Sequence, residues 1–233
     1  MSVETPRDPS RAVSRIYLVR HGRTAMNTEV RFRGRRDVPL DSVGRAEALA
    51  VAQSLGHVGL EAVYSSPLSR AREVAIAIAA VAGLTRFEDI DGLVNLEYGS
   101  WEGLTKEECA ERDPDAFRLY AEAPDVAECP DGEALAAAAD RIVATLREIG
   151  GRHPGQSVAA VTHGVMVRLA VLRTIGSARG DWQFELPTGS ATVFDVSDTG
   201  VRLASVIDRT RPDPVKAAAG DVEQAAATIA TGR

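Results

Sequence analysis

The stretch Ile16-Tyr17-Leu18-Val19-Arg20-His21-Gly22 decides the fold class of this chain. Its apolar residues 16–19 predict a buried strand, and in open α/β sheets ligands bind just beyond the carboxyl ends of such strands. Arg20 and His21 stand at that position, so the sequence predicts a site there. A lone histidine after a strand is more often structural, and a three-residue motif is a weak signal by itself.

A second stretch ends in the same way. Residues 158–161 predict another buried strand, and Thr162-His163-Gly164 follows it. Only four histidines occur in the chain, and two of them therefore follow an apolar strand and precede a glycine. A neutral imidazole nitrogen is an accepted covalent nucleophile, so this pair favours phosphoryl transfer. A helix predicted at 165–175 begins beside His163, where the N–H groups around Gly164 can bind a phosphoryl oxygen.

Phosphoryl transfer also needs fixed cations, since the reaction depends on positioning and on stabilising charged oxygens. Arginine suits this task through its planar fork of donors, and Arg20 is one candidate. Arg70 is another, because a helix starting at Pro67 with Ser66 as its N-cap places Arg70 near the helix N-terminus. A cation there opposes the helix dipole unless it faces a bound anion. The alternative for Arg70 is a solvent-facing arginine.

The leaving oxygen needs an acid. Residues 96–103 form a glycine-punctuated loop with two carboxylates, Glu97 and Glu102, and two aromatic residues, Tyr98 and Trp101. A carboxyl group that is partly desolvated by aromatic rings retains its proton more readily near neutral pH. From these residues alone, either Glu97 or Glu102 qualifies.

Taken together and in this order, the four segments resemble the histidine phosphatase superfamily, also called the phosphoglycerate mutase-like family, over about residues 16–208. The resemblance implies an α/β fold, a three-layer αβα sandwich with a mainly parallel sheet and an antiparallel C-terminal strand. It implies that His21 is phosphorylated and that Glu97, rather than Glu102, is the acid. The rest of the implied catalytic core is Arg20, Arg70 and His163.

The same resemblance implies that Asn27, Arg33 and Gly34 line the phosphate pocket, with the Gly34 backbone close to the anion. The chain also departs from the usual pattern. Arg23 stands where the family often has Glu, Gln or Ser, and Arg35 stands where Trp often follows the glycine. These changes predict an unusually basic mouth to the site, in which Arg23 contributes to substrate selection. Further departures are Met26, Val74 and Val165, none of which removes a charge or a nucleophile.

The segment between Glu97 and His163 distinguishes two reactions. Cofactor-dependent phosphoglycerate mutases have a longer insertion there, with an adjacent arginine pair for the substrate, and this segment contains no adjacent arginines. The expected function is therefore a metal-independent phosphatase that needs no cofactor and acts on a small phosphorylated metabolite. A mutase-type phosphoryl transfer and a non-catalytic phosphate-binding module are the alternatives.

Composition limits the possible partners. The 233 residues carry a formal charge of −6, which argues against a general nucleic-acid or anionic-membrane binder. Cys109 and Cys129 are too few and too isolated for a disulfide framework, so we expect reduced thiols. Residues 1–14 contain no apolar signal core and no stretch reaches membrane-spanning length, so the expected location is the cytoplasm. A homodimer is common among similar proteins.

Along the chain, strands and helices alternate, as in a sheet covered on both faces. We expect one domain at 15–210, a flexible segment at 1–14 and a tail at 211–233. The expected order is a helix at 41–55, a strand at 62–64, a helix at 67–82, an edge strand near 87–90, a helical insertion at about 104–131, a helix at 132–149, and two final strands at 190–196 and 201–208. Phe117 and Tyr120 would share a helix face in the insertion, either capping the pocket or, the preferred interpretation, packing in the core.

Overall fold

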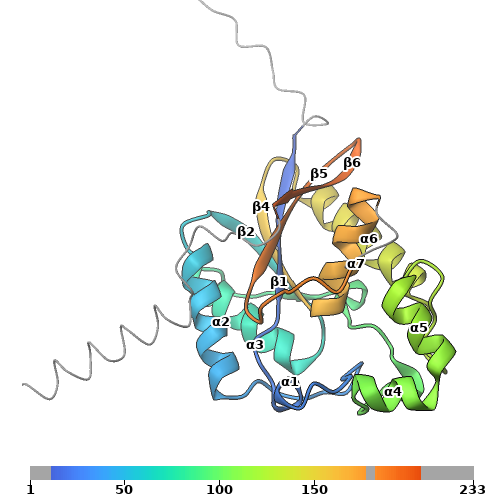
Figure 1. Ribbon diagram of the computed structural model, residues 1–233. Coiled ribbons are helices and arrows are strands. Elements are labelled where there is room, and N and C mark those ends of the chain that lie inside the picture. The colour runs from blue at the N-terminus through green and yellow to red at the C-terminus, as the bar shows by residue number, and fades with distance from the viewer. Residues whose placement is uncertain (1–11, 177–181, 206–233) are drawn as a thin grey trace, which may run out of the picture.

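The computed structural model describes residues 12–176 and 182–205, which form a six-stranded sheet with helices on both faces (Figure 1). Strand order is β3-β2-β4-β1-β5-β6. β1 pairs in parallel with β4 and antiparallel with β5, which confirms the predicted mainly parallel sheet with an antiparallel C-terminal part. The strands are β1 (Ser14–Arg20), β2 (Leu60–Ser65), β3 (Glu88–Asp89), β4 (Ser157–Thr162), β5 (Ala191–Ser197) and β6 (Gly200–Ser205).

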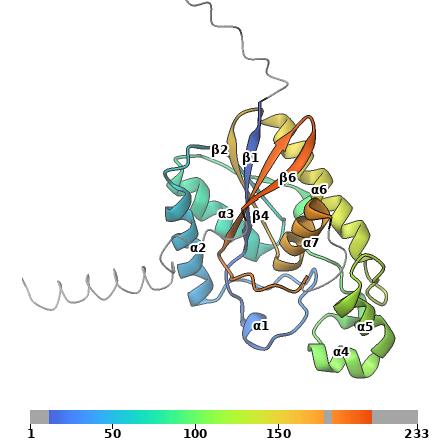
Figure 2. The same cartoon turned by 45° about the horizontal axis from the view of Figure 1, so that its top comes forward.

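Two pairs of helices complete the three layers (Figure 2). On one face, α2 (Ser42–Leu55) and α3 (Ser69–Val81) bury a core that includes Val51, Val74 and Ile78. On the other face, α6 (Leu135–Arg152) and α7 (Gly164–Ile175) bury the larger core, which contains Leu18, Leu146 and Phe194. β1 and β4 supply side chains to both cores because alternate residues of a strand point to opposite faces. The predicted sandwich is confirmed.

The insertion contains two short helices, α4 (Lys106–Arg112) and α5 (Pro114–Glu122), beside the lower end of the sheet in Figure 1. α4 begins with a capping box between Thr105 and Glu108. Tyr120 is 5% exposed, and its ring lies 5.7 Å from Trp101 and 5.1 Å from Trp182. The insertion is therefore fixed by an aromatic core, as the preferred interpretation of Phe117 and Tyr120 predicted.

Some predicted boundaries were wrong. α3 begins at Ser69 with Leu68 as its N-cap, so Ser66 does not cap it and Pro67 lies outside it. The reason is that the Ser66 side chain is bound to His163, as described below. Residues 1–11 of the predicted N-terminal segment, residues 206–208 of the last predicted strand and the tail at 211–233 lie outside the described residues. Within the described residues no helix is long and apolar enough to cross a membrane.

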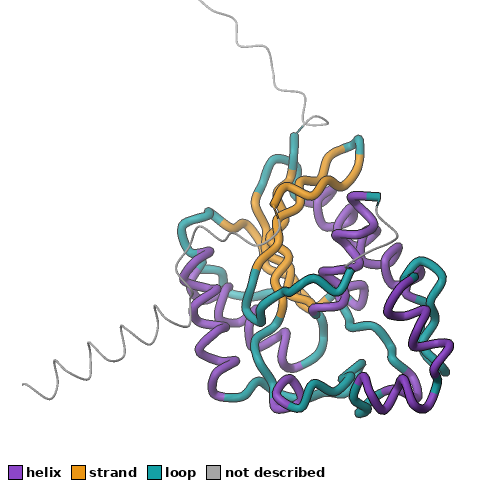
Figure 3. Tube along the Cα trace, in the orientation of Figure 1, coloured by secondary structure: helices purple, strands orange, loops and turns teal. Residues whose placement is uncertain are grey.

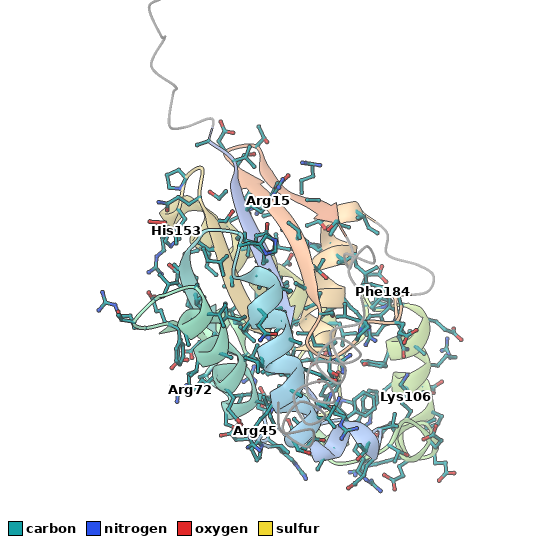
Figure 4. The ribbon with its side chains drawn as sticks, turned by 90° about the vertical axis from the view of Figure 1, so that its left-hand side faces the viewer. Arg15, Arg45, Arg72, Lys106, His153 and Phe184 are labelled. Carbon is teal, nitrogen blue, oxygen red and sulfur yellow. The ribbon has the colours of Figure 1, made fainter. Side chains whose placement is uncertain are left out.

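The parallel strands end at one edge of the sheet, where the loops gather (Figure 3). Arg20 on β1 is level with Thr162 on β4, and the N–H of His21 donates to Thr162 O at 3.0 Å. The N–H of Ser66, after β2, donates to Val161 O at 2.9 Å. Figure 4 shows Arg45 and Arg72, near the starts of α2 and α3, at this lower end and Arg15, near the start of β1, at the upper end. Register alone therefore brings the residues that follow three strands together.

The loop after β1 packs directly against the first turn of α2. Asp41 caps this helix by accepting from the N–H of Gly44 at 2.8 Å. A Cβ on Gly44 would lie 2.0 Å from Arg23 O, and a Cβ on Gly22 would lie 2.3 Å from Gly44 O. Both contacts are with backbone, which cannot move aside as the end of a flexible side chain can. Glycine at 22 and 44 therefore sets how close α2 lies to the His21 loop.

We predict that Gly44→Ala lowers the free energy of unfolding by about 1–3 kcal/mol, as overpacking typically does. Urea unfolding followed by circular dichroism measures it. Gly151→Ala is the matched control, since Gly151 is also helical and a Cβ there meets nothing within 4 Å. The control should be neutral or stabilised by up to about 1 kcal/mol. Equal stability of the two variants would contradict the packing argument.

Candidate active site

His21 lies at the centre of the site and is 1% exposed. Its Nδ1 is 2.6 Å from Gly22 O. A carbonyl oxygen can only accept, so Nδ1 carries the hydrogen and Nε2 keeps its lone pair. Burial, and then the positive charges of Arg70, Arg33 and Arg20, hold the pKa of His21 well below its usual value. His21 is therefore a neutral imidazole with an unprotonated Nε2.

His163 packs beside His21, with 5.2 Å between the ring centroids. Its Nε2 is 2.8 Å from Ser66 Oγ, and Ser66 Oγ also accepts from the N–H of Leu68 at 3.4 Å. A hydroxyl donates one hydrogen bond and accepts up to two, so Ser66 Oγ can either donate to His163 Nε2 or accept from it, and the imidazole proton lies on Nδ1 in the first case. Within the part of the chain that the structure describes, His163 Nδ1 is buried and has no hydrogen-bond partner. Burial and the charge of Arg70 hold the pKa of His163 well below its usual value.

Three arginines surround the histidine pair. In each of Arg20, Arg33 and Arg70 the Nε is buried and has no hydrogen-bond partner among the described residues. Burial, and then repulsion from Arg33, lowers the pKa of Arg20 and of Arg70 to about 10, so both stay charged at neutral pH. Buried donors without partners are uncommon, and clustered cations repel each other. A bound oxyanion would satisfy these donors and remove the repulsion.

Backbone carbonyls fix two of these arginines. Arg70 donates from Nη2 to Gly34 O at 2.9 Å and from Nη1 to Arg36 O at 2.7 Å. Arg20 donates from Nη1 to Leu186 O. Gly164 lies against Arg20, because a Cβ at 164 would be 3.1 Å from Arg20 Nε. The start of α7 therefore packs closely on Arg20, and binding of a phosphoryl oxygen by the N–H groups around Gly164 stays a prediction.

The loop that carries Arg33 is anchored by Glu102. Gly34 has φ +53, and a Cβ on it would lie 1.7 Å from Glu102 Oε1, so this turn requires glycine. Glu102 Oε1 accepts from the N–H of Arg35 at 2.9 Å. Asn95 Nδ2 donates to Gly34 O at 2.9 Å from the other side. Glu102 is therefore occupied in holding this loop, which favours Glu97 of the two candidate acids.

Glu97 is more open to solvent than the sequence suggested. Its side chain is 47% exposed and its Oε2 pairs with Arg35 Nη1 at 2.8 Å. The expected desolvation by neighbouring aromatic rings was wrong, since Tyr98 and Trp101 turn into the insertion core and are 6% and 0% exposed. The reason is that the 3₁₀ turn Gly99–Trp101 directs both rings under α5.

Arg23 and Asn27 have partners of their own. Arg23 Nε donates to Asp41 Oδ2 at 2.8 Å, so Arg23 forms an ion pair with the N-cap of α2. Asn27 Oδ1 accepts from both the N–H and Oγ1 of Thr24, which closes the capping box of α1 (Ala25–Thr28). Only its NH₂ group remains for a ligand.

Three polar residues of the site were missed by the sequence analysis. Ser66 was taken as a cap, and Asn95 and Glu47 were not singled out. Glu47 is 8% exposed and joins two loops by accepting from the N–H of Arg23 at 2.7 Å and from Thr188 Oγ1 at 2.7 Å. Each of the three acts on a residue far away in the chain, so no local pattern marks it. A charged residue on the buried side of α2 is the one available signal for Glu47.

Metal ligands are not grouped in the described part of the chain. Among residues 12–176 and 182–205, no cluster of three or more His, Cys, Asp or Glu side chains is arranged to hold a metal ion. Cys109 and Cys129 are buried and unpaired. Burial raises the pKa of Cys109 to about 11 and that of Cys129 to about 12, so both are unreactive thiols at neutral pH.

We predict that His21 and His163 are neutral at pH 6.5, where an ordinary histidine is about half protonated, because both pKa values are lowered. ¹⁵N NMR of the imidazoles checks this, with His21 protonated on Nδ1 only. Both histidines have a lower pKa in the folded state than in the unfolded state. The two neutral side chains therefore make their full contribution to the free energy of unfolding above about pH 6.5, and this contribution is lost as the pH falls and the unfolded histidines bind protons. Protonation of both nitrogens of His21 or of His163 at pH 6.5 would contradict the arrangement.

Comparison with known proteins agrees with this geometry. The model of the histidine phosphatase superfamily (branch 1) matches residues 16–209. Phosphoserine phosphatase 1 of Hydrogenobacter thermophilus is 31% identical over 79% of this chain and 87% of its own length. A metal-independent phosphoserine phosphatase of Arabidopsis thaliana is 36% identical over 69% of this chain and 68% of its own length.

A solved structure, YhfR of Bacillus stearothermophilus, has a TM-score of 0.75 and 28% identity, covering 87% of this chain and 99% of that one. These relatives support a phosphatase activity. The family match includes the strand before His21 and the strand before His163, so it spans the whole site. This chain belongs to the histidine phosphatase superfamily.

Proposed function

We propose that this protein hydrolyses a small phosphomonoester through a phosphohistidine formed on Nε2 of His21. One observation carries the proposal: the Nδ1 contact to Gly22 O leaves Nε2 unprotonated, beside arginines whose Nε donors have no partner in residues 12–176 and 182–205. A neutral nucleophile amid fixed cations is suited to attack on a phosphate ester. The −6 charge of the whole chain does not oppose this, because the cations are concentrated at the site.

The reaction has two steps. In the first, the Nε2 lone pair of His21 attacks phosphorus and the ester P–O bond breaks. Glu97, after it leaves Arg35 and takes up a proton from solvent, gives that proton to the leaving oxygen. In the second, Glu97 takes a proton from water, the water oxygen attacks phosphorus, and the P–N bond breaks to release phosphate. Arg20, Arg33, Arg70 and the Nδ1–H of His163 hold the phosphoryl oxygens in both steps.

We predict that His21→Ala abolishes phosphate release, because it removes the Nε2 atom that attacks phosphorus. Phosphate release from a panel of small phosphoesters measures it. The wild type should also carry phosphate on His21 after a rapid alkaline quench, located by mass spectrometry. His57→Ala, at an exposed histidine after α2, is the control and should keep full activity. Phosphate release by the His21→Ala protein would overturn the proposal.

The products separate the phosphatase from its alternatives. With 3-phosphoglycerate and a bisphosphoglycerate primer, a phosphatase releases inorganic phosphate, whereas a mutase forms 2-phosphoglycerate. A chelator should leave the rate unchanged, since the arginines supply the positive charge that a metal ion would supply elsewhere. Absence of phosphohistidine with every ester in the panel would favour the non-catalytic phosphate-binding module.

We predict that Glu97→Gln slows hydrolysis of alkyl phosphates by on the order of 10²–10⁴-fold, the usual contribution of a general acid. With p-nitrophenyl phosphate the rate of the first step should fall much less, because p-nitrophenolate leaves without needing a proton. Pre-steady-state release of p-nitrophenol isolates that step. Glu102→Gln is the comparison, and it should affect both esters alike because Glu102 holds the Arg35 loop. If Glu97→Gln slowed the hydrolysis of both esters equally, a residue other than Glu97 would be the general acid.

A further inference from the structure

Arg35 lies between Glu97 and the loop that carries Arg33 and Gly34. Its backbone follows Gly34, whose carbonyl is held by Arg70 and Asn95, and its N–H is held by Glu102. The backbone of Arg35 is therefore fixed at the edge of the arginine cluster. Its side chain is 42% exposed, so the guanidinium remains open to a ligand.

The side chain of Arg35 makes contacts that a ligand can replace. Nη1 pairs with Glu97 Oε2 at 2.8 Å, while Nη2 is 3.6 Å from Glu133 Oε2 and Nε is 3.5 Å from Asn95 O. Glu133 does not depend on Arg35, because Arg141 binds it with two hydrogen bonds of 3.1 and 2.9 Å. The contact with Glu97 is thus the one close ion pair of the Arg35 side chain among the described residues.

Other exposed arginines near the site have structural partners. Arg23 pairs with the N-cap Asp41, and Arg36 Nη2 donates to the backbone carbonyl of Glu102 at 2.9 Å. Arg35 differs because its close partner is Glu97, whose protonated form is the proposed acid for the leaving oxygen. The side chain of Glu97 is 47% exposed, and ion pairs between exposed groups contribute little and exchange readily.

We infer that Arg35 recognises a carboxylate that the substrate carries on its leaving group, close to the ester oxygen. The inference rests on the proposed function: if Glu97 reaches the leaving oxygen, then Arg35 Nη1, 2.8 Å from Glu97, lies beside the carbon atoms bound to that oxygen. A guanidinium fork binds a carboxylate through two parallel hydrogen bonds, which the contacts to Glu97 and Glu133 do not provide. The substrate carboxylate takes the place of Glu97 on Arg35, and Glu97 turns to the ester oxygen.

A pair of matched substrates tests this. O-phosphoserine and O-phosphoethanolamine have the same phosphoester and amine and differ by the carboxylate alone. The wild type should prefer O-phosphoserine in kcat/KM, and Arg35→Gln should reduce that preference by on the order of 10- to 100-fold, mainly through KM, as loss of a charge-assisted hydrogen bond does. A general effect of the substitution on Glu97 changes kcat/KM for both esters alike, so it cancels in the ratio of the two kcat/KM values. Arg35→Lys, which keeps the charge but loses the fork, should restore part of the preference.

Arg45→Gln is the matched control. Arg45 is an exposed arginine at the same end of the molecule (Figure 4) and pairs with Glu73 at 2.8 Å, so its loss changes the net charge equally. It should leave the preference unchanged. An equal kcat/KM for both esters in the wild type, or an unchanged preference in Arg35→Gln, would overturn the role of Arg35 while phosphate release still supports the proposed function. No phosphate release from either ester or from p-nitrophenyl phosphate would overturn the proposed function and this inference with it.

Discussion

Buried positive charge around one neutral imidazole is the constraint on which the rest of this structure depends. Arg20, Arg33 and Arg70 converge near His21 without a carboxylate bound to any of their Nε atoms in the described structure. Such a cluster is costly in a folded protein, since burial and mutual repulsion both disfavour the charged form. The surrounding fold therefore has to hold it in place through groups that do not neutralise it.

Backbone carbonyls provide that support. Arg70 is bound by the carbonyls of Gly34 and Arg36, and Arg20 by that of Leu186. Carbonyl oxygens orient a guanidinium and stabilise it without forming a full ion pair, so its charge remains available to an anion. Among the described residues, carboxylates bind the neighbouring loops and not these arginine side chains. Glu102 binds the Arg35 backbone, and Glu47 joins the loop of Arg23 to the loop of Thr188. The site thus keeps its charge while its loops are fixed by acidic residues.

Positions close to a strand end were predictable from the sequence. An apolar strand followed by a polar residue fixes where that residue lies at the sheet edge, and parallel pairing of β1 with β4 makes His21 and His163 neighbours. The helices were likewise predictable from their caps and spacing, as Asp41 at the start of α2 illustrates. Where this reasoning failed, a distant partner outweighed a local preference. Ser66 has good N-cap chemistry, yet its hydroxyl binds His163, 97 residues away in the chain.

The sequence by itself determined the α/β class, the order of strands and helices, and the set of chemically active residues: two histidines, several arginines and two candidate acids. Only the tertiary structure decided how those residues are used. It assigned the unprotonated nitrogen of His21 through the Gly22 carbonyl, paired Arg23 with Asp41, used Glu102 to hold a loop and placed Arg35 on Glu97. The physical reason is that charge and hydrogen-bond partners depend on contacts within a few ångströms, between residues that the chain separates widely.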